Sequence, residues 1–230
     1  MNNKEYVISK IKESVVNDAP WKHVVIKDFM PPSLYEGMKN EITPYEASPC
    51  LKNVNTRAYH IYVNDSVGVY PNTPYLKEYY DILSDESVLN EVLKKLELTS
   101  QPLPKDFYSE VNFITQDWIY DEVHPDRSDK LITMIHYLAD EGDDESLGTF
   151  LYTPHVDGKN LRVFEDMVSS TPYVGNCFLM FAPQDTKECR TNHCMGNNSK
   201  KTFIRKSIQA FWIKEKADWT KDKQSGRIRL

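Results

Sequence analysis

The chain has 230 residues, of which 40% are hydrophobic and 27% charged, a composition typical of a globular protein with a sizeable core. A formal net charge of -6 argues against a surface devoted to nucleic acid. The longest apolar run is far shorter than a membrane span, and the N-terminus lacks the unbroken apolar region of a signal peptide. We therefore expect a cytoplasmic protein with neither nucleic acid nor membrane as a partner.

The first hundred residues are expected to be mainly helical. An N-terminal helix is predicted by Ile8, Ile11, Val15 and Val16, which recur at helical spacing. Further helices are predicted over residues 33–42 and 73–81, and from Ser84 or Asp85 to Leu96. A short apolar run at residues 23–26 predicts a strand.

From about Lys105 the pattern changes to short apolar stretches separated by turn-rich segments. Strands are predicted at residues 111–115, 131–138, 148–152, 161–164, 177–181 and 203–213. Many short strands at this spacing are typical of a sandwich or a jelly-roll barrel. We expect an α+β fold that is mainly β. In one domain, residues 1–104 would form a helical support packed on the barrel, 105–215 the core and 216–230 a polar tail.

The strongest chemical signal comes from His124-Pro125-Asp126 and the distant His193. On an extended strand, His124 and Asp126 point to the same face, so one strand can supply two ligands to one ion. Two imidazoles and a carboxylate occupy three corners of an octahedral metal and leave three positions open, as in non-heme Fe(II) oxygenases. The stretch from Asp126 to His193 is long enough for the strands that a jelly roll places between such ligands. The sequence therefore predicts a metal site.

Other histidines and cysteines offer weaker alternatives. His155-Val156-Asp157 repeats the HxD pattern, but its neighbours are loop-forming residues, and the stretch from Asp157 to His193 is short for the strands that a jelly roll places between such ligands, so we expect a surface loop. His136, inside an apolar strand, is expected to be packed and hydrogen-bonded. Cys189 and Cys194 flank His193, yet a zinc site would need further ligands that the neighbourhood lacks.

The last predicted strand carries Arg205 and Ser207 on one face and Lys206 on the other. A guanidinium group beside a hydroxyl, pointing into a barrel, is suited to gripping a carboxylate bidentately. The alternative is a surface strand with an ordinary ion-paired arginine. Because Arg205 follows shortly after the candidate metal histidine, we favour a site for a dicarboxylate co-substrate.

These segments together resemble the 2-oxoglutarate- and Fe(II)-dependent oxygenases, nearest to the prolyl-4-hydroxylase-like branch. The resemblance extends from about Lys105 to Ile213. It is carried by His124-Pro125-Asp126, residues 130–138, 147–150 and 176–181, His193 and Arg205-Lys206-Ser207. It implies a double-stranded β-helix with the N-terminal helices packed on its outside.

The resemblance also implies roles for individual residues. His124, Asp126 and His193 match the iron ligands, and Arg205 and Ser207 match the residues that bind the distal carboxylate of 2-oxoglutarate. Tyr137 is similar to the tyrosine that hydrogen-bonds the same carboxylate, although a core tyrosine would fit its position equally well.

By this resemblance the chain would be a dioxygenase that uses Fe(II), 2-oxoglutarate and O2, with ascorbate as an auxiliary reductant. It would couple the oxidative decarboxylation of 2-oxoglutarate to succinate and CO2 with hydroxylation of a C–H bond. Asp126 favours hydroxylation, because a small residue there would open a halide site. A prolyl residue of a protein or peptide and a small metabolite such as a sugar are both candidate substrates, and the oligomeric state stays open.

Two other functions fit parts of the pattern. One is a cupin-like barrel that binds metal or sugar without oxidative turnover. The other is a zinc hydrolase with an activated water, which would leave Arg205 and Ser207 without a role.

Overall fold

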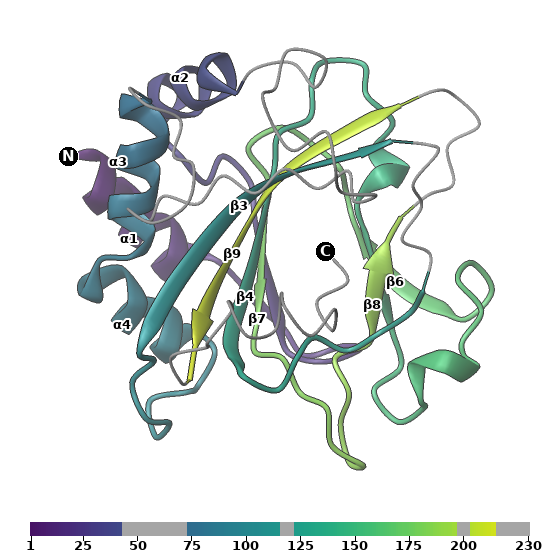
Figure 1. Cartoon of the computed structure of the whole chain (residues 1–230). Coiled ribbons are helices and arrows are strands. Elements are labelled where there is room, and N and C mark those ends of the chain that lie inside the picture. The colour runs from purple at the N-terminus through teal and green to yellow at the C-terminus, as the bar shows by residue number, and fades with distance from the viewer. Residues whose placement is uncertain (43–72, 116–121, 197–202, 215–230) are drawn as a thin grey trace, which may run out of the picture.

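The computed structural model describes residues 1–42, 73–115, 122–196 and 203–214, and it contains two antiparallel sheets (Figure 1). The large sheet has the strand order β1-β2-β7-β4-β9-β3, and the small sheet has the order β6-β5-β8. The strands are β1 (Val16–Asn17), β2 (His23–Ile26), β3 (Asp106–Thr115), β4 (Lys130–Tyr137), β5 (Thr149–Tyr152), β6 (Met167–Thr171), β7 (Phe178–Phe181), β8 (His193–Met195) and β9 (Ile204–Ile213). This arrangement confirms the predicted fold class. The expected polar tail lies outside the described residues.

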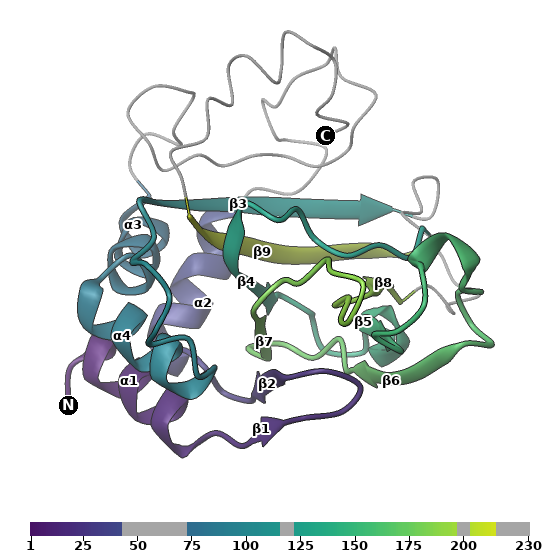
Figure 2. The ribbon, with the colours of Figure 1, turned by 90° about the horizontal axis from the view of Figure 1, so that it is seen from below.

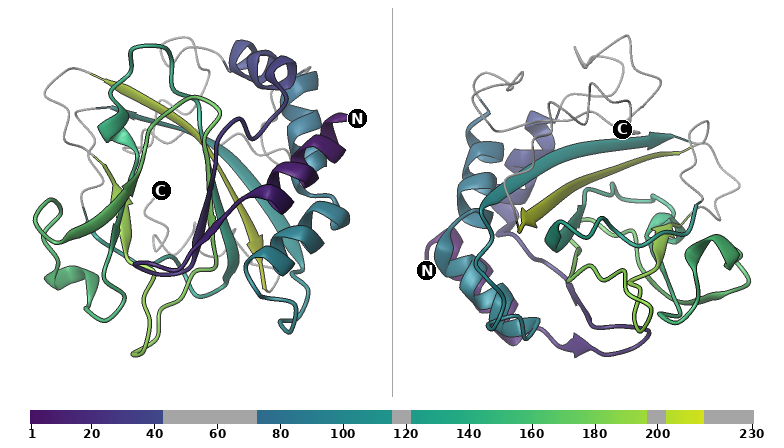
Figure 3. Two further views of the ribbon diagram at one scale, coloured as in Figure 1. Left: turned by 180° about the vertical axis from the view of Figure 1, so that it is seen from behind. Right: turned by 60° about the horizontal axis from the view of Figure 1, so that its bottom comes forward.

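The α-helices of the described chain gather on one side of the large sheet, as Figures 1 and 3 show from opposite directions. They are α1 (Asn3–Glu13), α2 (Pro32–Glu41), α3 (Pro74–Leu83) and α4 (Glu86–Lys95). The predicted cap of α4 is present, since the Asp85 side chain accepts the Ser87 N–H at 2.8 Å. None of the described helices combines the length and apolar character needed to cross a bilayer.

The first helix ends earlier than its apolar spacing suggested. The chain leaves the helical conformation at Ser14, and Val16 pairs with Val24 at the edge of the large sheet. Val15 is 73% exposed. Strand pairing thus overrides the helical periodicity at this point, and the N-terminal region supplies β1 and β2 to the sheet as well as helices (Figure 2).

The central strand β4 separates two hydrophobic layers. Ile132 and Met134 pack with the helices, whereas Ile135 and Tyr137 face the space between the two sheets. Alternation of side chains along a strand produces this division. The neighbouring strand β9 follows the same rule, so the side chains that it directs inward meet those of Tyr137 and Ile135.

The small sheet differs from the sequence prediction in two places. Residues 161–164, predicted as a strand, form a turn that is closed by Arg162, which donates to the Asp166 carboxylate from its backbone and its guanidinium group, each at 2.7 Å. The strand β6 therefore begins later, at Met167. The strand β8 was not predicted, and it pairs with β5 through Leu151 and His193.

Candidate metal centre

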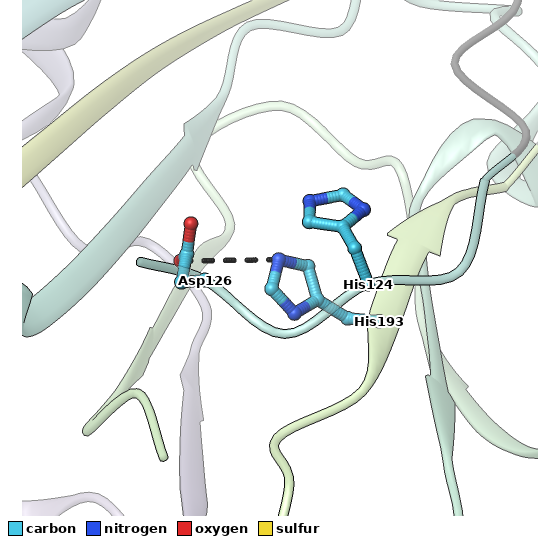
Figure 4. Close-up of side chains that lie close together, drawn as sticks. All are labelled: His124, Asp126 and His193. Carbon is cyan, nitrogen blue, oxygen red and sulfur yellow. Dashed lines mark ion pairs between the residues drawn. The ribbon is translucent and has the colours of Figure 1, made fainter. Parts of the chain in front are cut away.

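His124, Asp126 and His193 lie together at one end of the space between the sheets (Figure 4). One ligand atom from each residue can be chosen so that all of them lie within 4.8 Å of one another. Within the described parts of the chain, this is the one cluster of three or more histidine, cysteine or acidic side chains with such spacing. The geometry fits a shared metal ion with two imidazole ligands and one carboxylate ligand.

A backbone bridge brings the two histidines together. The His124 N–H donates to the His193 carbonyl at 3.1 Å, and the His193 N–H donates to the His124 carbonyl at 2.9 Å. Their ring centroids are 4.8 Å apart. The sequence placed His124 and Asp126 on one extended strand, but His124 forms only this isolated bridge and Asp126 lies in the irregular segment before β4. The bridge to β8 brings His124 to His193, whereas the Asp126 carboxylate is held by hydrogen bonds from Lys130 and Thr133.

Both imidazoles have the same hydrogen-bond arrangement. Nδ1 of His124 lies 2.8 Å from the Glu122 carbonyl, and Nδ1 of His193 lies 2.8 Å from the Thr191 carbonyl. Because a carbonyl oxygen can only accept, each Nδ1 must carry the proton, and each Nε2 then holds a lone pair. Histidines that ligate metals are commonly oriented by such a bond from the other ring nitrogen. In each ring Nε2 is therefore the nitrogen that can ligate a metal.

The Asp126 carboxylate is held by two neighbours from the start of β4. Lys130 Nζ lies 2.6 Å from Oδ1, and Thr133 Oγ1 donates to Oδ2 at 2.6 Å. Burial on its own raises the pKa of this carboxyl, but the charge of Lys130 and the hydrogen bonds from Lys130 and Thr133 outweigh it, so the pKa is well below its usual range. Asp126 is therefore an anion at neutral pH.

The His193 ring packs against two aromatic side chains. Its ring centroid is 5.1 Å from that of Phe181 and 6.5 Å from that of Trp21. Burial lowers the pKa of His193 to about 4, and the Asp126 charge only partly opposes this effect. The ring is consequently neutral at neutral pH, which leaves its lone pair available to a cation.

Arg205 is buried elsewhere in the same inter-sheet space and is 2% exposed. Its Nε donates to the Leu147 carbonyl at 2.6 Å, and its Nη1 is 3.5 Å from Ser207 Oγ. No carboxylate within the described chain pairs with Arg205. Burial lowers the pKa of the guanidinium group, and the Tyr137 and Tyr173 side chains partly oppose this effect. A buried cation without a counter-charge is costly, so this position is prepared for an anion.

The structure also brings Tyr137 to this cation. Tyr137 is the cross-strand partner of Ser207, and its ring centroid is 5.4 Å from the guanidinium carbon of Arg205. Its hydroxyl donates to Thr149 Oγ1 at 2.7 Å and lies 2.6 Å from Thr171 Oγ1. Tyr137 is thus a fully buried core tyrosine that also lies beside Arg205, so the two interpretations of the sequence are compatible.

The residues set aside in the sequence lie elsewhere. His155 is exposed, with Nδ1 3.1 Å from the Glu188 carbonyl, and Asp157 caps a short 3-10 helix, η3 (Gly158–Asn160). His136 is buried in the helix layer, with Nε2 3.1 Å from Asn176 Oδ1. Cys194 Sγ lies 3.0 Å from the Tyr152 hydroxyl. These positions agree with the structural roles expected of His155 and His136.

Two residues that line the candidate site had no recognised role in the sequence. Trp21 precedes β2, and it reaches His193 only because β2 pairs with β7, an interaction between distant segments that local sequence does not encode. Lys130 begins the segment 130–138, and its ammonium group turns inward to Asp126. Its spacing of four from an acidic residue was the available signal, although that spacing usually indicates a helical pair.

This chain resembles known proteins in its fold but not in its sequence. No protein-family model and no curated protein matches the sequence. The fold, however, matches solved structures. A prolyl 4-hydroxylase from Phytophthora capsici has a TM-score of 0.63 and 12% identity, with 98% of this chain and 74% of that chain covered.

Two further structures support the same conclusion. A Pseudomonas putida prolyl-4-hydroxylase has a TM-score of 0.54 and 11% identity, with 93% of this chain and 95% of that chain covered. AviO1 from Streptomyces viridochromogenes has a TM-score of 0.52 and 12% identity, with 94% of this chain and 97% of that chain covered. Identities this low establish likeness of fold alone. The chain therefore has the double-stranded β-helix fold of the prolyl 4-hydroxylases.

Proposed function

We propose that this protein is an Fe(II)- and 2-oxoglutarate-dependent dioxygenase that hydroxylates a C–H bond. The observation that carries the proposal is the buried charge of Arg205, which no carboxylate of the described residues compensates, in the same inter-sheet space as the His124, Asp126 and His193 cluster. A metal site alone fits many functions. A metal site together with a separate buried anion site fits a co-substrate that chelates the metal at one end and carries a second carboxylate at the other.

The residues present fit an Fe(II) ion. Two imidazoles and one carboxylate are the donor set of the facial triad, and in both rings Nδ1 is bonded to a carbonyl, so Nε2 is the nitrogen that would ligate the metal. These residues would hold an iron ion that 2-oxoglutarate chelates and at which O2, the oxidant of the reaction, is activated. The protein's part is to hold the partners in place and to exclude water.

Arg205 and Ser207 would bind the distal carboxylate of 2-oxoglutarate. The guanidinium group is fixed by the Leu147 carbonyl, so its orientation is set before any ligand arrives. Ser207 is fully buried and lies next to it. A preorganised, desolvated cation binds a carboxylate much more strongly than an exposed one does. Tyr137 would support the guanidinium group through its ring and be near enough to contribute its hydroxyl to the same carboxylate.

Apolar side chains form part of the lining between the two residue groups. Ile135, Leu179 and Phe181 belong to one buried cluster, which includes Tyr137 near Arg205 and reaches His193 through Phe181. Such a lining excludes water from the region where the co-substrate would lie, and it strengthens every charge interaction there. The carboxylate of Asp126 occupies the place that a halide would need, which favours hydroxylation over halogenation.

The substrate belongs to one of two classes. Two of the solved structures that share the fold are prolyl 4-hydroxylases, which supports a prolyl residue of a protein or peptide. A small metabolite such as a sugar is the other class. A screen with prolyl peptides and with sugars separates them.

The proposal is tested by measuring succinate release. The protein is loaded with Fe(II) without oxygen, supplied with 2-oxoglutarate and ascorbate, and then exposed to O2, beside a His193→Ala control. Succinate from the wild type alone is expected. If none forms, calorimetric titration of the Mn(II)-loaded protein with 2-oxoglutarate decides: binding without turnover indicates that substrate is required, whereas absence of binding would refute the proposal in favour of a cupin-like barrel.

A further inference from the structure

Lys130 is the unexpected neighbour of the metal cluster. Its ammonium group lies 2.6 Å from Asp126 Oδ1 and 3.9 Å from the centre of the Phe211 ring. The side chains of Lys130 and Asp126 are 12% and 10% exposed. This ion pair is therefore largely removed from water, where charge-assisted hydrogen bonds are strong and well oriented. The roles proposed for the metal ligands and for Arg205 do not account for the positively charged Lys130 next to a metal site.

The two oxygens of Asp126 are in different environments. Oδ1 is held by Lys130, while Oδ2 accepts from Thr133 and lies 3.9 Å from Nε2 of His193. Oδ2 is thus the oxygen on the histidine side. A carboxylate can bind a metal through one oxygen or through both, and an ammonium group on one oxygen opposes the second mode by charge repulsion and by occupying its lone pair.

The number of bonds from Asp126 matters because an octahedral ion has six positions. With one bond from each of the three protein ligands, three positions remain, which accommodate a chelating co-substrate and O2. With both carboxylate oxygens bound, only two remain, and the chelating co-substrate fills them. No position would then be left for O2.

We infer that Lys130 is a positioning residue that restricts Asp126 to a single metal bond and so keeps open the coordination position that O2 needs. The inference rests on the proposed function. Lys130 acts through Asp126 rather than on a substrate. The aromatic face of Phe211 supports the ammonium group at 3.9 Å, and the backbone of Lys130 is fixed by its pairing with Ile213 at the start of β4.

The test counts the exchangeable water molecules on Mn(II) in the loaded protein from the longitudinal relaxation of water protons, with and without 2-oxoglutarate. The variant Lys130→Met removes the charge and keeps an apolar stem against Phe211. Lys130→Arg restores a cationic donor. The matched control is Lys39→Met, because Lys39 is also paired with an aspartate, Asp140, at 2.8 Å and also lies over an aromatic ring, at 5.5 Å, but on the helix side of the sheet.

In the wild type, in Lys130→Arg and in Lys39→Met we expect three waters on Mn(II) alone and one after 2-oxoglutarate binds. In Lys130→Met we expect one water fewer in each state. An unchanged count in Lys130→Met would overturn the inference. Lys130→Gln, which also removes the charge, is used in its place if Lys130→Met does not fold by circular dichroism.

The two proposals fail in distinguishable ways. If 2-oxoglutarate displaces no water from the wild type, the proposed function fails. The comparison of Lys130→Met with the wild type on Mn(II) alone still decides whether Lys130 limits the bonds from Asp126. If 2-oxoglutarate binds normally and the count on Mn(II) alone does not depend on Lys130, only the inference about Lys130 is wrong.

Discussion

At the scale of single residues, Arg205 is a positively charged side chain buried between the two sheets. Its side chain is almost completely buried, its partners within the described chain are a carbonyl, a hydroxyl and two aromatic rings, and no carboxylate balances its charge. A guanidinium group in this setting costs the folded state free energy until an anion binds. An unbalanced buried charge that persists in a fold is therefore evidence of a ligand.

Replacing Arg205 by alanine should weaken the binding of 2-oxoglutarate by roughly 2–4 kcal/mol, since a buried charge pair would lose one partner. The dissociation constant is measured by calorimetry with Mn(II) in place of iron. Arg162→Ala is the control, because Arg162 is an exposed arginine paired with Asp166 and should leave the constant unchanged. An unchanged dissociation constant in Arg205→Ala would mean that the distal carboxylate of 2-oxoglutarate binds elsewhere.

Tyr137 is predicted to matter for stability even without a ligand. In Tyr137→Phe the hydroxyls of Thr149 and Thr171 lose a buried partner, and a lost buried hydrogen bond costs about 1–3 kcal/mol. Urea unfolding without 2-oxoglutarate measures this loss. The exposed Tyr75 gives the comparison variant Tyr75→Phe, for which little change is expected. Equal stabilities of the two variants would contradict the structural role of Tyr137.

At the scale of elements, the metal cluster depends on how closely η3 approaches the two histidine segments. A Cβ atom on Gly158 would lie 2.4 Å from the Val123 carbonyl oxygen and 3.3 Å from Asn192 Oδ1. Val123 precedes His124, and Asn192 precedes His193. Gly158 therefore packs against the residues that precede both histidines, and only a residue without a side chain fits there.

Gly158→Ala should push the His124 segment away and weaken Mn(II) binding by about 10–100-fold, the range found for other changes just outside a metal's ligands. The Mn(II) dissociation constant is measured directly. Gly142→Ala is the informative control: Gly142 has a φ of +87° and open space around its Cβ position, so alanine there should lower the stability but leave Mn(II) binding intact. If both variants bound Mn(II) like the wild type, the packing argument would be wrong.

The elements that the sequence predicted well were those specified by local pattern. The strand at residues 131–138 and the cap at Asp85 are encoded by nearby residues, and the structure contains both. The elements that were missed depend on distant partners. β8 is only His193–Met195, and it is a strand because β5 lies beside it, while Val16 joins a strand because Val24 is adjacent.

The same distinction between local patterns and distant contacts explains which parts of the candidate site could be predicted from the sequence. Ligand types at HxD spacing and an inward-facing Arg205 can be read from one segment at a time. The contact between Trp21 and His193 and the pair between Lys130 and Asp126 depend on how the segments fold back on one another. Sequence reasoning therefore singled out the residues with chemical signatures, and it did not predict the contacts that Trp21 and Lys130 make with them.

At the scale of the whole molecule, a buried histidine couples the helical layer to the sheet. His136 is fully buried and its ring stacks on Tyr79 at 5.6 Å, with Phe29 and Phe178 close by. Burial lowers the pKa of His136 to about 4, against an ordinary value of 6.5. The unfolded chain thus takes up this proton at a higher pH than the folded chain does.

The stability that depends on neutral His136 is fully present above pH 6.5 and is lost as the pH falls toward 4. At pH 5 the loss should be about 2 kcal/mol. Urea unfolding at pH 7 and pH 5 measures it. His136→Gln keeps an N–H donor for Asn176 but cannot take up a proton, so its stability should fall less over the same interval. An identical fall in both proteins would assign the pH dependence to other groups.

The backbone bridge between His124 and His193 has a consequence for folding as well as for chemistry. These two residues lie at the ends of a long loop that contains β4, β5, β6 and β7. An ion held by both rings is a reversible cross-link across that loop, and closing a long loop removes entropy from the unfolded chain. Because only the folded chain brings the rings together, a metal bound at this site would make the folding equilibrium depend on the free metal concentration. The supply of metal in a cell would then govern how much of this protein survives, and not only how much of it is active.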